Sequence, residues 1–252
     1  MEKGKKIWDS VGATDPYFAV YSVEKYLDSN LNENAKEDFF SSGLEYVEKL
    51  WVDLERIFGF EPRPKRVLDF GCGVGRLLFA LARRSERAVG VDISESMLTE
   101  ARGRIAERGI ENVELMETSA FLRSSKTFDL IHSFIVLQHI DPDEGMAIIK
   151  RSVEMLEDGG IGMLHVTFHD PSSRMQRIKS KIDANLGPLR PVAHKLRGGT
   201  PVPWLPMNVY DMNAVLELLR SLGCYNVSIK FTDHGMIGAM IFLQKGGSID
   251  YS

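Results

Sequence analysis

Three glycines at alternate positions follow an acidic residue in the first strand-like segment of the chain. Residues 67–75 read Val-Leu-Asp-Phe-Gly-Cys-Gly-Val-Gly, with Asp69 two residues before the first glycine. Glycine lacks a Cβ atom and lets the backbone come close to a ligand. A helix starting near Gly75 would direct its N–H groups and the positive end of its dipole at that ligand. The segment therefore predicts a ligand-binding turn between a strand and a helix.

A second acidic residue completes the pattern. Asp92 ends the apolar stretch 88–91, nineteen residues after Gly73. An acid about twenty residues beyond such a turn, at the end of the next strand, can accept hydrogen bonds from both hydroxyls of a ribose. The two features together predict a nucleoside site; the alternative is a strand–helix turn that binds nothing.

Details of the turn distinguish between nucleosides. A dinucleotide fingerprint reads Gly-x-Gly-x-x-Gly, but Arg76 stands where its third glycine would be. Asp69 would repel a pyrophosphate and suits a ligand that carries an ammonium. S-adenosylmethionine meets these requirements, because it has an α-amino group, a sulfonium and no phosphate. NAD contains a pyrophosphate, so an NAD-dependent oxidoreductase is disfavoured by Arg76 and Asp69.

At these residues the chain resembles the class I S-adenosylmethionine-dependent methyltransferases, whose first motif reads much like residues 67–76. The resemblance covers about residues 60–169 by motif and 208–245 by the order of elements. It implies S-adenosyl-L-methionine as the cofactor and an enzyme of the small-molecule type. It also implies that Asp69 and the backbone around Gly71, Cys72 and Gly73 face the methionine part of the cofactor.

The resemblance assigns the rest of the cofactor to residues after the next two strands. Asp92 would hold the ribose, and Ile93 and Met97 would sandwich the adenine, although Met97 could equally serve helix packing. Many family members have an aspartate where this chain has Ser119, whose hydroxyl is a weaker acceptor than a carboxylate. The backbone of the two residues that follow could also read the adenine edge, and these are Ala120 and Phe121.

Residues 128–139 resemble the fourth motif of the family, and Ser133 to Ile135 would pass beneath the sulfonium. The segment lacks the Asn/Asp-Pro-Pro-Tyr sequence that grips planar amines. The cysteine pairing of cytosine-C5 enzymes is missing as well. Methylation of DNA bases or of glutamine is therefore not expected, and no nucleic-acid partner is predicted.

Two histidines are candidates for a catalytic role. His139 follows the expected fourth strand, beside the methyl donor, and His169 follows the fifth strand at the same edge. An imidazole with a near-neutral pKa could deprotonate a hydroxyl as it attacks. Orienting the turn at Asp141 is the alternative for His139. An unprotonated amine would need no base, because positioning alone can supply much of the rate. His132 and His165 lie inside expected strands and are predicted to be packed.

Alternating strand and helix patterns must position these residues. An amphipathic helix at 37–58 ends at Gly59, and a later helix runs from Asp141 to about Glu157, where Gly159 and Gly160 stop it. The expected strands span residues 66–70, 88–92, 112–117, 128–137, 162–169, 225–231 and 237–244. This alternation predicts a doubly wound α/β fold with a mostly parallel sheet and helices on both faces. The final tight connection makes the last strand antiparallel, and the resemblance implies seven strands in the order 3-2-1-4-5-7-6.

Composition places the chain among ordinary globular proteins. It has 252 residues, 44% of them hydrophobic, and 31 basic against 35 acidic residues give a net charge of −4. The whole chain is therefore not a polyanion binder by charge. Its two cysteines, Cys72 and Cys224, predict separate free thiols, and no metal-ligand spacing is present. No metal is therefore predicted. No membrane span or apolar signal core is expected either, so we predict a cytoplasmic protein.

Two segments lie outside the methyltransferase pattern. Residues 1–59 are predicted to form an N-terminal helical lid or cap, with Trp8, Tyr17 and Tyr21 as lid candidates, and packing of these aromatic residues in the core is an equal alternative. Residues 60–252 would form the methyltransferase domain, with an inserted basic substrate-recognition segment at about 170–207. Residues 174–197 of that segment carry seven basic residues and one acid. They could hold a phosphate or carboxylate or form a solvated surface, and Trp204 could line a pocket.

The sequence thus favours a small-molecule methyltransferase that acts on a hydroxyl, on a sugar or an anionic metabolite. Two alternatives remain. The first is N-methylation of a small-molecule amine on the same fold. The second is a nucleoside-binding module of this fold that has lost catalysis.

Overall fold

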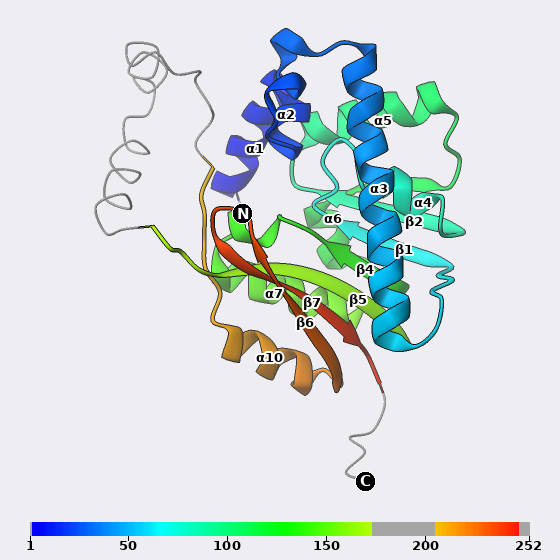
Figure 1. Ribbon diagram of the computed structural model, residues 1–252, viewed down its shortest axis with the longest axis vertical. Helices are drawn as coiled ribbons and strands as arrows, with labels where there is room; N and C mark the ends of the chain where they lie inside the picture. Colours follow the sequence, from blue (N-terminus) through cyan, green and yellow to red (C-terminus); the bar gives the residue numbers. More distant parts are fainter. Residues whose placement is uncertain (1, 173–204, 247–252) are drawn as a thin grey trace.

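The computed structural model describes residues 2–172 and 205–246. Its centre is a seven-stranded sheet with the order β3-β2-β1-β4-β5-β7-β6 (Figure 1). Neighbouring strands from β3 to β5 pair in parallel, whereas β7 runs antiparallel to both β5 and β6. The predicted strand order and the antiparallel last strand are confirmed. The strands are β1 (Arg66–Phe70), β2 (Arg87–Asp92), β3 (Val113–Glu117), β4 (Phe128–Ser133), β5 (Leu156–His169), β6 (Asn226–Asp233) and β7 (Ile237–Gln244).

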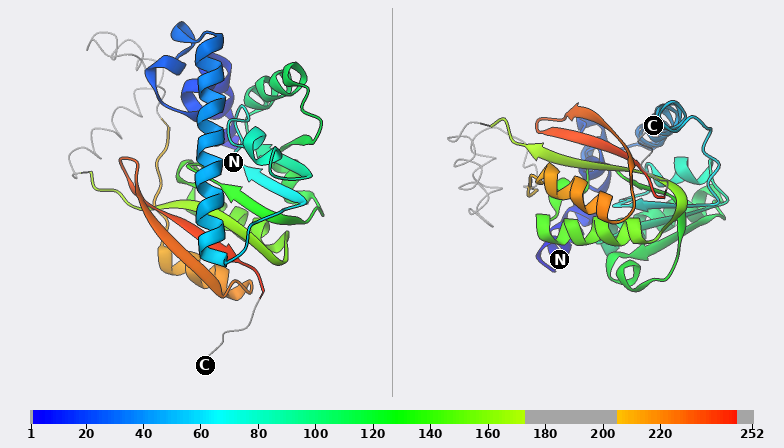
Figure 2. Two further views of the ribbon diagram at one scale, coloured as in Figure 1. Left: turned by 45° about the vertical axis from the view of Figure 1, so that its right-hand side comes forward. Right: turned by 90° about the horizontal axis from the view of Figure 1, so that it is seen from below.

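Helices cover both faces of this sheet. On one face, α3 and α4 pack on apolar side chains of β1, β4, β5 and β7, and α5 packs beside them. On the other face, α6, α7 and α10 enclose a second core, and Figure 2 shows α7 and α10 together on one side of the sheet. The helices are α1 (Glu2–Thr14), α2 (Pro16–Val20), η1 (Glu24–Tyr26), η2 (Asp28–Asn30), α3 (Glu33–Phe58), α4 (Leu78–Ala82), α5 (Glu95–Arg108), α6 (Thr118–Arg123), η3 (Leu137–His139), α7 (Pro142–Glu154) and α10 (Met212–Ser221).

Helix α3 is long and amphipathic, as its apolar spacing predicts, but it begins one turn before the predicted residue 37. The side chain of Asn32 accepts a hydrogen bond from the Ala35 amide at 2.9 Å and so caps the helix. Gly59 ends it in the left-handed conformation, as expected. The first turn carries no apolar stripe, so the periodic pattern did not include it.

Two predicted boundaries were wrong near the fourth and fifth strands. Strand β4 ends at Ser133 and not at Leu137, because Ile135 has φ = 58°, a left-handed conformation that turns the chain out of the extended course of the strand. Strand β5 begins at Leu156, and Gly159 and Gly160 lie inside it instead of stopping the preceding helix. The irregular register of β5 against β4 absorbs these residues.

The N-terminal helices pack beside α5, at the end of the sheet where β2 leads into that helix. The Ser94 hydroxyl donates to the Trp8 carbonyl at 3.1 Å, and the Glu95 amide donates to the Asp9 carboxylate at 2.7 Å. The Tyr17 hydroxyl donates to Glu100 at 2.6 Å. These bonds fix α1 and α2 over the carboxyl end of β2. Within the described ranges, no helix is both long and apolar enough to cross a membrane.

Candidate active site

The glycine turn after β1 is built as the sequence predicts, although α4 begins only at Leu78. Gly71 and Gly73 both have positive φ, at 78° and 52°. A Cβ atom on Gly71 would lie 2.2 Å from a methyl carbon of Val136, so only glycine fits there. The amide of Gly71 donates to the carbonyl of Val91 at 2.7 Å, which ties the turn to β2.

Asp92, at the end of β2, holds the same turn from the other side. One carboxylate oxygen accepts from the Gly73 amide at 2.8 Å, and the other accepts from the Ser94 amide at 2.9 Å. Burial raises the pKa of Asp92 to about 6, although these backbone donors favour the charged form. Each carboxylate oxygen keeps a further lone pair that could accept from a ribose hydroxyl.

Asp69 takes part in a buried chain of hydrogen bonds that the sequence did not indicate. Its Oδ1 atom lies 2.7 Å from Nδ1 of His132, whose Nε2 lies 3.1 Å from the Tyr46 hydroxyl. Because a carboxylate can only accept, Nδ1 carries the proton and Nε2 accepts from Tyr46. His132 is packed, as predicted, and it also orients Asp69. Tyr46 comes from α3, and no local motif links it to Asp69.

Three buried polar atoms at this edge of the sheet have no partner within the described part of the chain. They are Asp69 Oδ2, Ser133 Oγ and Gln138 Oε1, at or just beyond the ends of β1 and β4. Buried polar atoms are normally satisfied. An unpartnered carboxylate oxygen on a side chain that is only 3% exposed suits an ammonium. These acceptor oxygens therefore fit the α-amino group of S-adenosylmethionine, which donates.

His139 is held in one tautomer at the same edge. Its Nδ1–H donates to the carbonyl of Pro206 at 2.8 Å, so the lone pair is on Nε2, which accepts from the Gln138 amide at 3.2 Å. The ring of Trp8 meets His139 edge-on, with 5.3 Å between centroids. Burial lowers the pKa of His139, although the hydrogen bond to Pro206 opposes this, and the lower pKa favours the neutral imidazole. The arrangement presents a neutral base.

The other histidines have different surroundings. His169 is exposed at the end of β5, and no described residue forms a hydrogen bond, ion pair or ring contact with its side chain. His165 is buried, as predicted, and lies 2.8 Å from the hydroxyl of Thr232. Burial, together with His234, lowers the pKa of His165 to about 4. The structure therefore places His139, and not His169, against Trp8 of α1 and the loop before α10.

The predicted adenine residues follow β2 and β3 in the expected places. Met97 is 1% exposed and lies under α1, where a Cβ on Gly12 would come within 3.0 Å of it, which favours the packing role. The Phe121 side chain is also in the core, against Phe70. Ala120 is exposed and Ser119 is partly buried in the first turn of α6.

Three further predicted residues of the cofactor site remain. Ile93 follows Asp92 and is partly buried. The Cys72 thiol is buried against β2, so its side chain faces the core, and only its backbone could contact a ligand at the turn. The basic residues of 174–197 and Trp204 lie outside the described residues.

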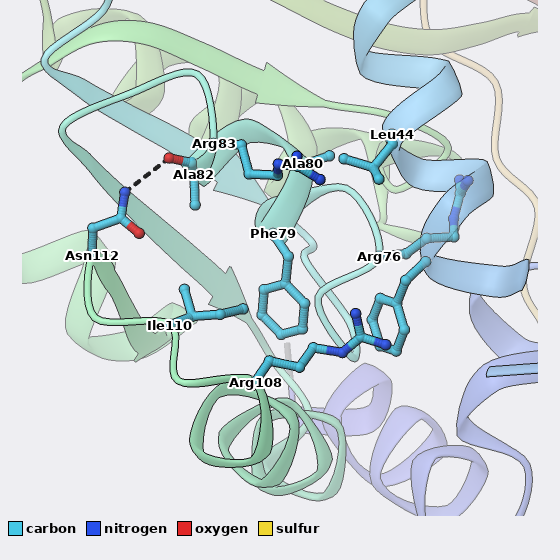
Figure 3. Close-up of a pocket in the computed structure, with 10 residues that line it drawn as sticks. Leu44, Arg76, Phe79, Ala80, Ala82, Arg83, Arg108, Ile110 and Asn112 are labelled. Atoms are coloured by element: carbon cyan, nitrogen blue, oxygen red, sulfur yellow. Dashed lines mark hydrogen bonds between the residues drawn. The ribbon is translucent and has the colours of Figure 1, made fainter. Parts of the chain in front are cut away.

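A cavity of about 410 Å³ lies apart from these residues, between α3, α4 and the end of α5 (Figure 3). Phe40 and Phe79 stack on one side of it, and Arg83 and Arg108 stand at its rim. None of the residues assigned above to the cofactor or to catalysis lines it.

Comparison with known sequences identifies the family of the chain. Residues 67–160 match the model of a methyltransferase-domain family. Aklanonic acid methyltransferase DauC of Streptomyces sp. strain C5 is 39% identical over 176 residues, which cover 64% of this chain and 74% of that protein. The ubiquinone biosynthesis O-methyltransferase of Aliivibrio fischeri strain MJ11 is 32% identical over 163 residues. That match covers 63% of this chain and 62% of the relative.

Solved structures share the fold. Magnesium protoporphyrin IX methyltransferase from Synechocystis PCC 6803, with S-adenosylhomocysteine bound, superposes with a TM-score of 0.61 at 19% identity, covering 96% of this chain and 98% of that one. A methyltransferase from Methanosarcina mazei gives a TM-score of 0.54 at 17% identity, covering 76% and 97%. The fold and the glycine turn define a Rossmann-like, nucleoside-binding α/β protein. Within that class, the chain belongs to the class I S-adenosylmethionine-dependent methyltransferases.

Proposed function

We propose that this enzyme transfers the methyl group of S-adenosylmethionine to an oxygen of a small molecule, a hydroxyl on a sugar or an anionic metabolite. The observation that carries the proposal is the fixed tautomer of His139. Two relatives support it by name: one is an O-methyltransferase and the other acts on aklanonic acid. An amine acceptor would not need the neutral base that His139 offers.

The chain's own residues account for the steps around the acceptor. A hydroxyl in place of the Gln138 amide would donate to His139 Nε2, which takes the proton as the oxygen attacks. The Pro206 carbonyl, bound to Nδ1–H, would stabilise the imidazolium that forms. Asp69 and Asp92 would hold the ammonium and the ribose of the cofactor. When bound, the cofactor supplies a methyl group on a positively charged sulfur.

The N-terminal segment 1–59 is proposed to act as a cap over this site. Trp8 reaches His139, and Val20 stands over the glycine turn, where a Cβ on Gly73 would lie 2.6 Å from its methyl carbon. A cap at these two points would exclude water from the reacting groups. The segment is one contiguous stretch that touches both the cofactor turn and the candidate base.

Steady-state kinetics with His139→Gln test the catalytic proposal. With hydroxyl acceptors, we expect kcat to fall about 100- to 1,000-fold, because general-base catalysis contributes on that scale. Affinity for S-adenosylhomocysteine, measured by calorimetry, should not change. His169→Gln is the competing variant, and its loss should be much smaller.

A panel of hydroxyl and amine acceptors, followed with a labelled methyl group, separates the alternatives. Equal loss of activity in both histidine variants, or an unchanged kcat in His139→Gln, would reject His139 as the base. Transfer to amines alone would replace O-methylation by N-methylation. Cofactor binding without transfer to any acceptor would favour a non-catalytic module.

A further inference from the structure

The cavity between α3, α4 and the end of α5 has an apolar interior. The rings of Phe40 and Phe79 stack in its wall, with 5.5 Å between centroids and 23° between planes. Leu44 of α3 and Ile110, just after α5, also line it (Figure 3). Its volume of about 410 Å³ lies within the range of small-molecule sites, roughly 300–1,000 Å³. The interior therefore suits the flat apolar body of a small ligand.

The charged side chains around this cavity are arginines. Arg76, Arg83 and Arg108 line it, and no carboxylate does so within the described part of the chain. Arg108 lies over the Phe40 ring at 4.4 Å and pairs with the exposed Glu37 at 2.7 Å. A concave surface that carries charges of one sign attracts ligands of the opposite sign. The cavity therefore favours an anion.

Two of these arginines have donors that no described residue uses. Arg76 is only 9% exposed, and its Nε atom has no partner within the described ranges. The side chain of Arg83 is exposed, and it makes no hydrogen bond, ion pair or ring contact with any described residue. In Figure 3 it extends from the end of α4 toward Leu44 of α3. Arg83 is thus the cation at the mouth that is available to a ligand.

A second hollow adjoins the cavity on the side of Arg83. Its volume is about 290 Å³, and it shares Leu44, Ala80 and Arg83 with the cavity. Glu48 lines this second hollow but is already paired with Arg84. The nearby carboxylate therefore does not neutralise Arg83, and a ligand held at Arg83 has room on both sides.

We propose that this cavity is a second ligand site, which binds a small aryl carboxylate. The ring system would lie against Phe40 and Phe79, and the carboxylate would accept hydrogen bonds from the Arg83 guanidinium. Arginine presents its donors in a planar fork that matches a carboxylate. Neither Asp69 nor Asp92 lines the cavity, so the site is separate from the proposed cofactor site.

Calorimetric titration with 2-naphthoate and its neutral analogue 2-naphthamide tests the proposal. We expect one naphthoate to bind per chain, about 3- to 10-fold more tightly than naphthamide, because the arginine is exposed. Arg83→Met should lower the naphthoate affinity to that of naphthamide and leave naphthamide binding unchanged. Arg123→Met makes the same change of charge at an exposed site in α6, on the other face of the sheet, and should alter neither affinity.

A variant that fills the cavity tests its location. Ala80 is 3% exposed and lines the cavity, so Ala80→Leu should abolish measurable binding of both probes. The Tm of the free variant shows whether it is folded; if it does not fold, Arg83→Met decides. The proposal would be overturned if neither probe bound, if Arg83→Met left naphthoate binding intact, or if folded Ala80→Leu still bound both probes.

Titration in the presence of saturating S-adenosylhomocysteine separates this site from the cofactor site. We expect a complex that holds naphthoate and S-adenosylhomocysteine together. Displacement of naphthoate would place it in the cofactor site and overturn the proposal. If the protein bound naphthoate as expected but not S-adenosylhomocysteine, the proposed function would fail and the second site would stand.

Discussion

The two halves of the candidate site are built in different ways. The donor half comprises residues 69–76 and 92–97, where backbone amides and two carboxylates from consecutive strands face one region. The acceptor half comprises residues 133–139 together with Trp8 and Pro206, and side chains from distant segments meet there. The donor half is therefore fixed by short-range geometry, and the acceptor half depends on how remote segments dock.

The support beneath the acceptor half shows this dependence. The hydroxyl of Tyr210 donates to the Leu137 carbonyl at 2.8 Å, and the Asn208 amide donates to the Gln138 carbonyl at 2.7 Å. These bonds attach η3 to the chain just before α10. His139 is thus oriented by residues about seventy positions later in the sequence. We expect the two halves to respond differently to substitution.

The largest effect is expected at Asp92, in the donor half. Asp92→Asn removes the charge that would accept from the ribose hydroxyls, so affinity for S-adenosylhomocysteine should fall by on the order of 2–4 kcal/mol, about 30- to 1,000-fold. Calorimetry measures the affinity, and circular dichroism checks the fold. Because Asp92 also accepts from Gly73 and Ser94, the variant should be less stable as well. An unchanged affinity would show that Asp92 does not hold the ribose.

The pH dependence gives an internal control for that variant. The pKa of Asp92, near 6 in the folded protein, lies above its ordinary value of 3.8. Ribose binding favours the ionised form, so affinity should weaken as the pH falls below about 6, and Asp92→Asn should lack this step.

The stability of the protein should depend on pH in the opposite direction. Because the pKa of Asp92 is raised on folding, the folded chain binds a proton at Asp92 more tightly than the unfolded chain does. The contribution of Asp92 to the free energy of unfolding therefore rises as the pH falls from about 6 toward 4.

A smaller effect is expected where the two halves are linked. His132 lies in β4 yet donates to Asp69, so His132→Phe would leave both oxygens of a buried carboxylate without a partner. We expect the free energy of unfolding, measured with urea, to fall by about 1–3 kcal/mol. Tyr46→Phe, which removes only the outer bond of the chain, should cost about 1 kcal/mol. Equal losses in the two variants would mean that Asp69 does not depend on His132.

The contrast between local geometry in the donor half and remote contacts in the acceptor half also explains which features could be predicted from the sequence. The strand order and the glycine turn depend on local patterns, and both agree with the structure. The early end of β4 was not predicted, because it depends on the left-handed backbone of Ile135. Isoleucine is β-branched and rarely adopts this conformation, so its residue type gives no indication of it. The partnership of Tyr46 with His132 and the bond from His139 to Pro206 join remote positions, and periodicity carries no information on such pairs.

The smallest effect is expected at Ser119, where the donor half departs from the usual family pattern. Ser119 lies in the first turn of α6, near the positive end of that helix, and its side chain is partly buried. Ser119→Asp would place a stronger acceptor near the expected adenine edge, while the neighbouring Glu117 is already paired with Lys5. We therefore expect binding of S-adenosylhomocysteine, measured by calorimetry, to tighten by up to about tenfold.

The base analogue S-inosylhomocysteine, which has no exocyclic amino group, provides the control for Ser119→Asp. The gain in affinity should disappear with this ligand, because the new carboxylate would have no amino donor to bind. A gain that is equal for both ligands would indicate a general electrostatic effect of the added charge. A large loss of affinity in a folded variant would mean that Ser119 packs where a carboxylate cannot be solvated. The donor half would then depend on side-chain packing as closely as the acceptor half does.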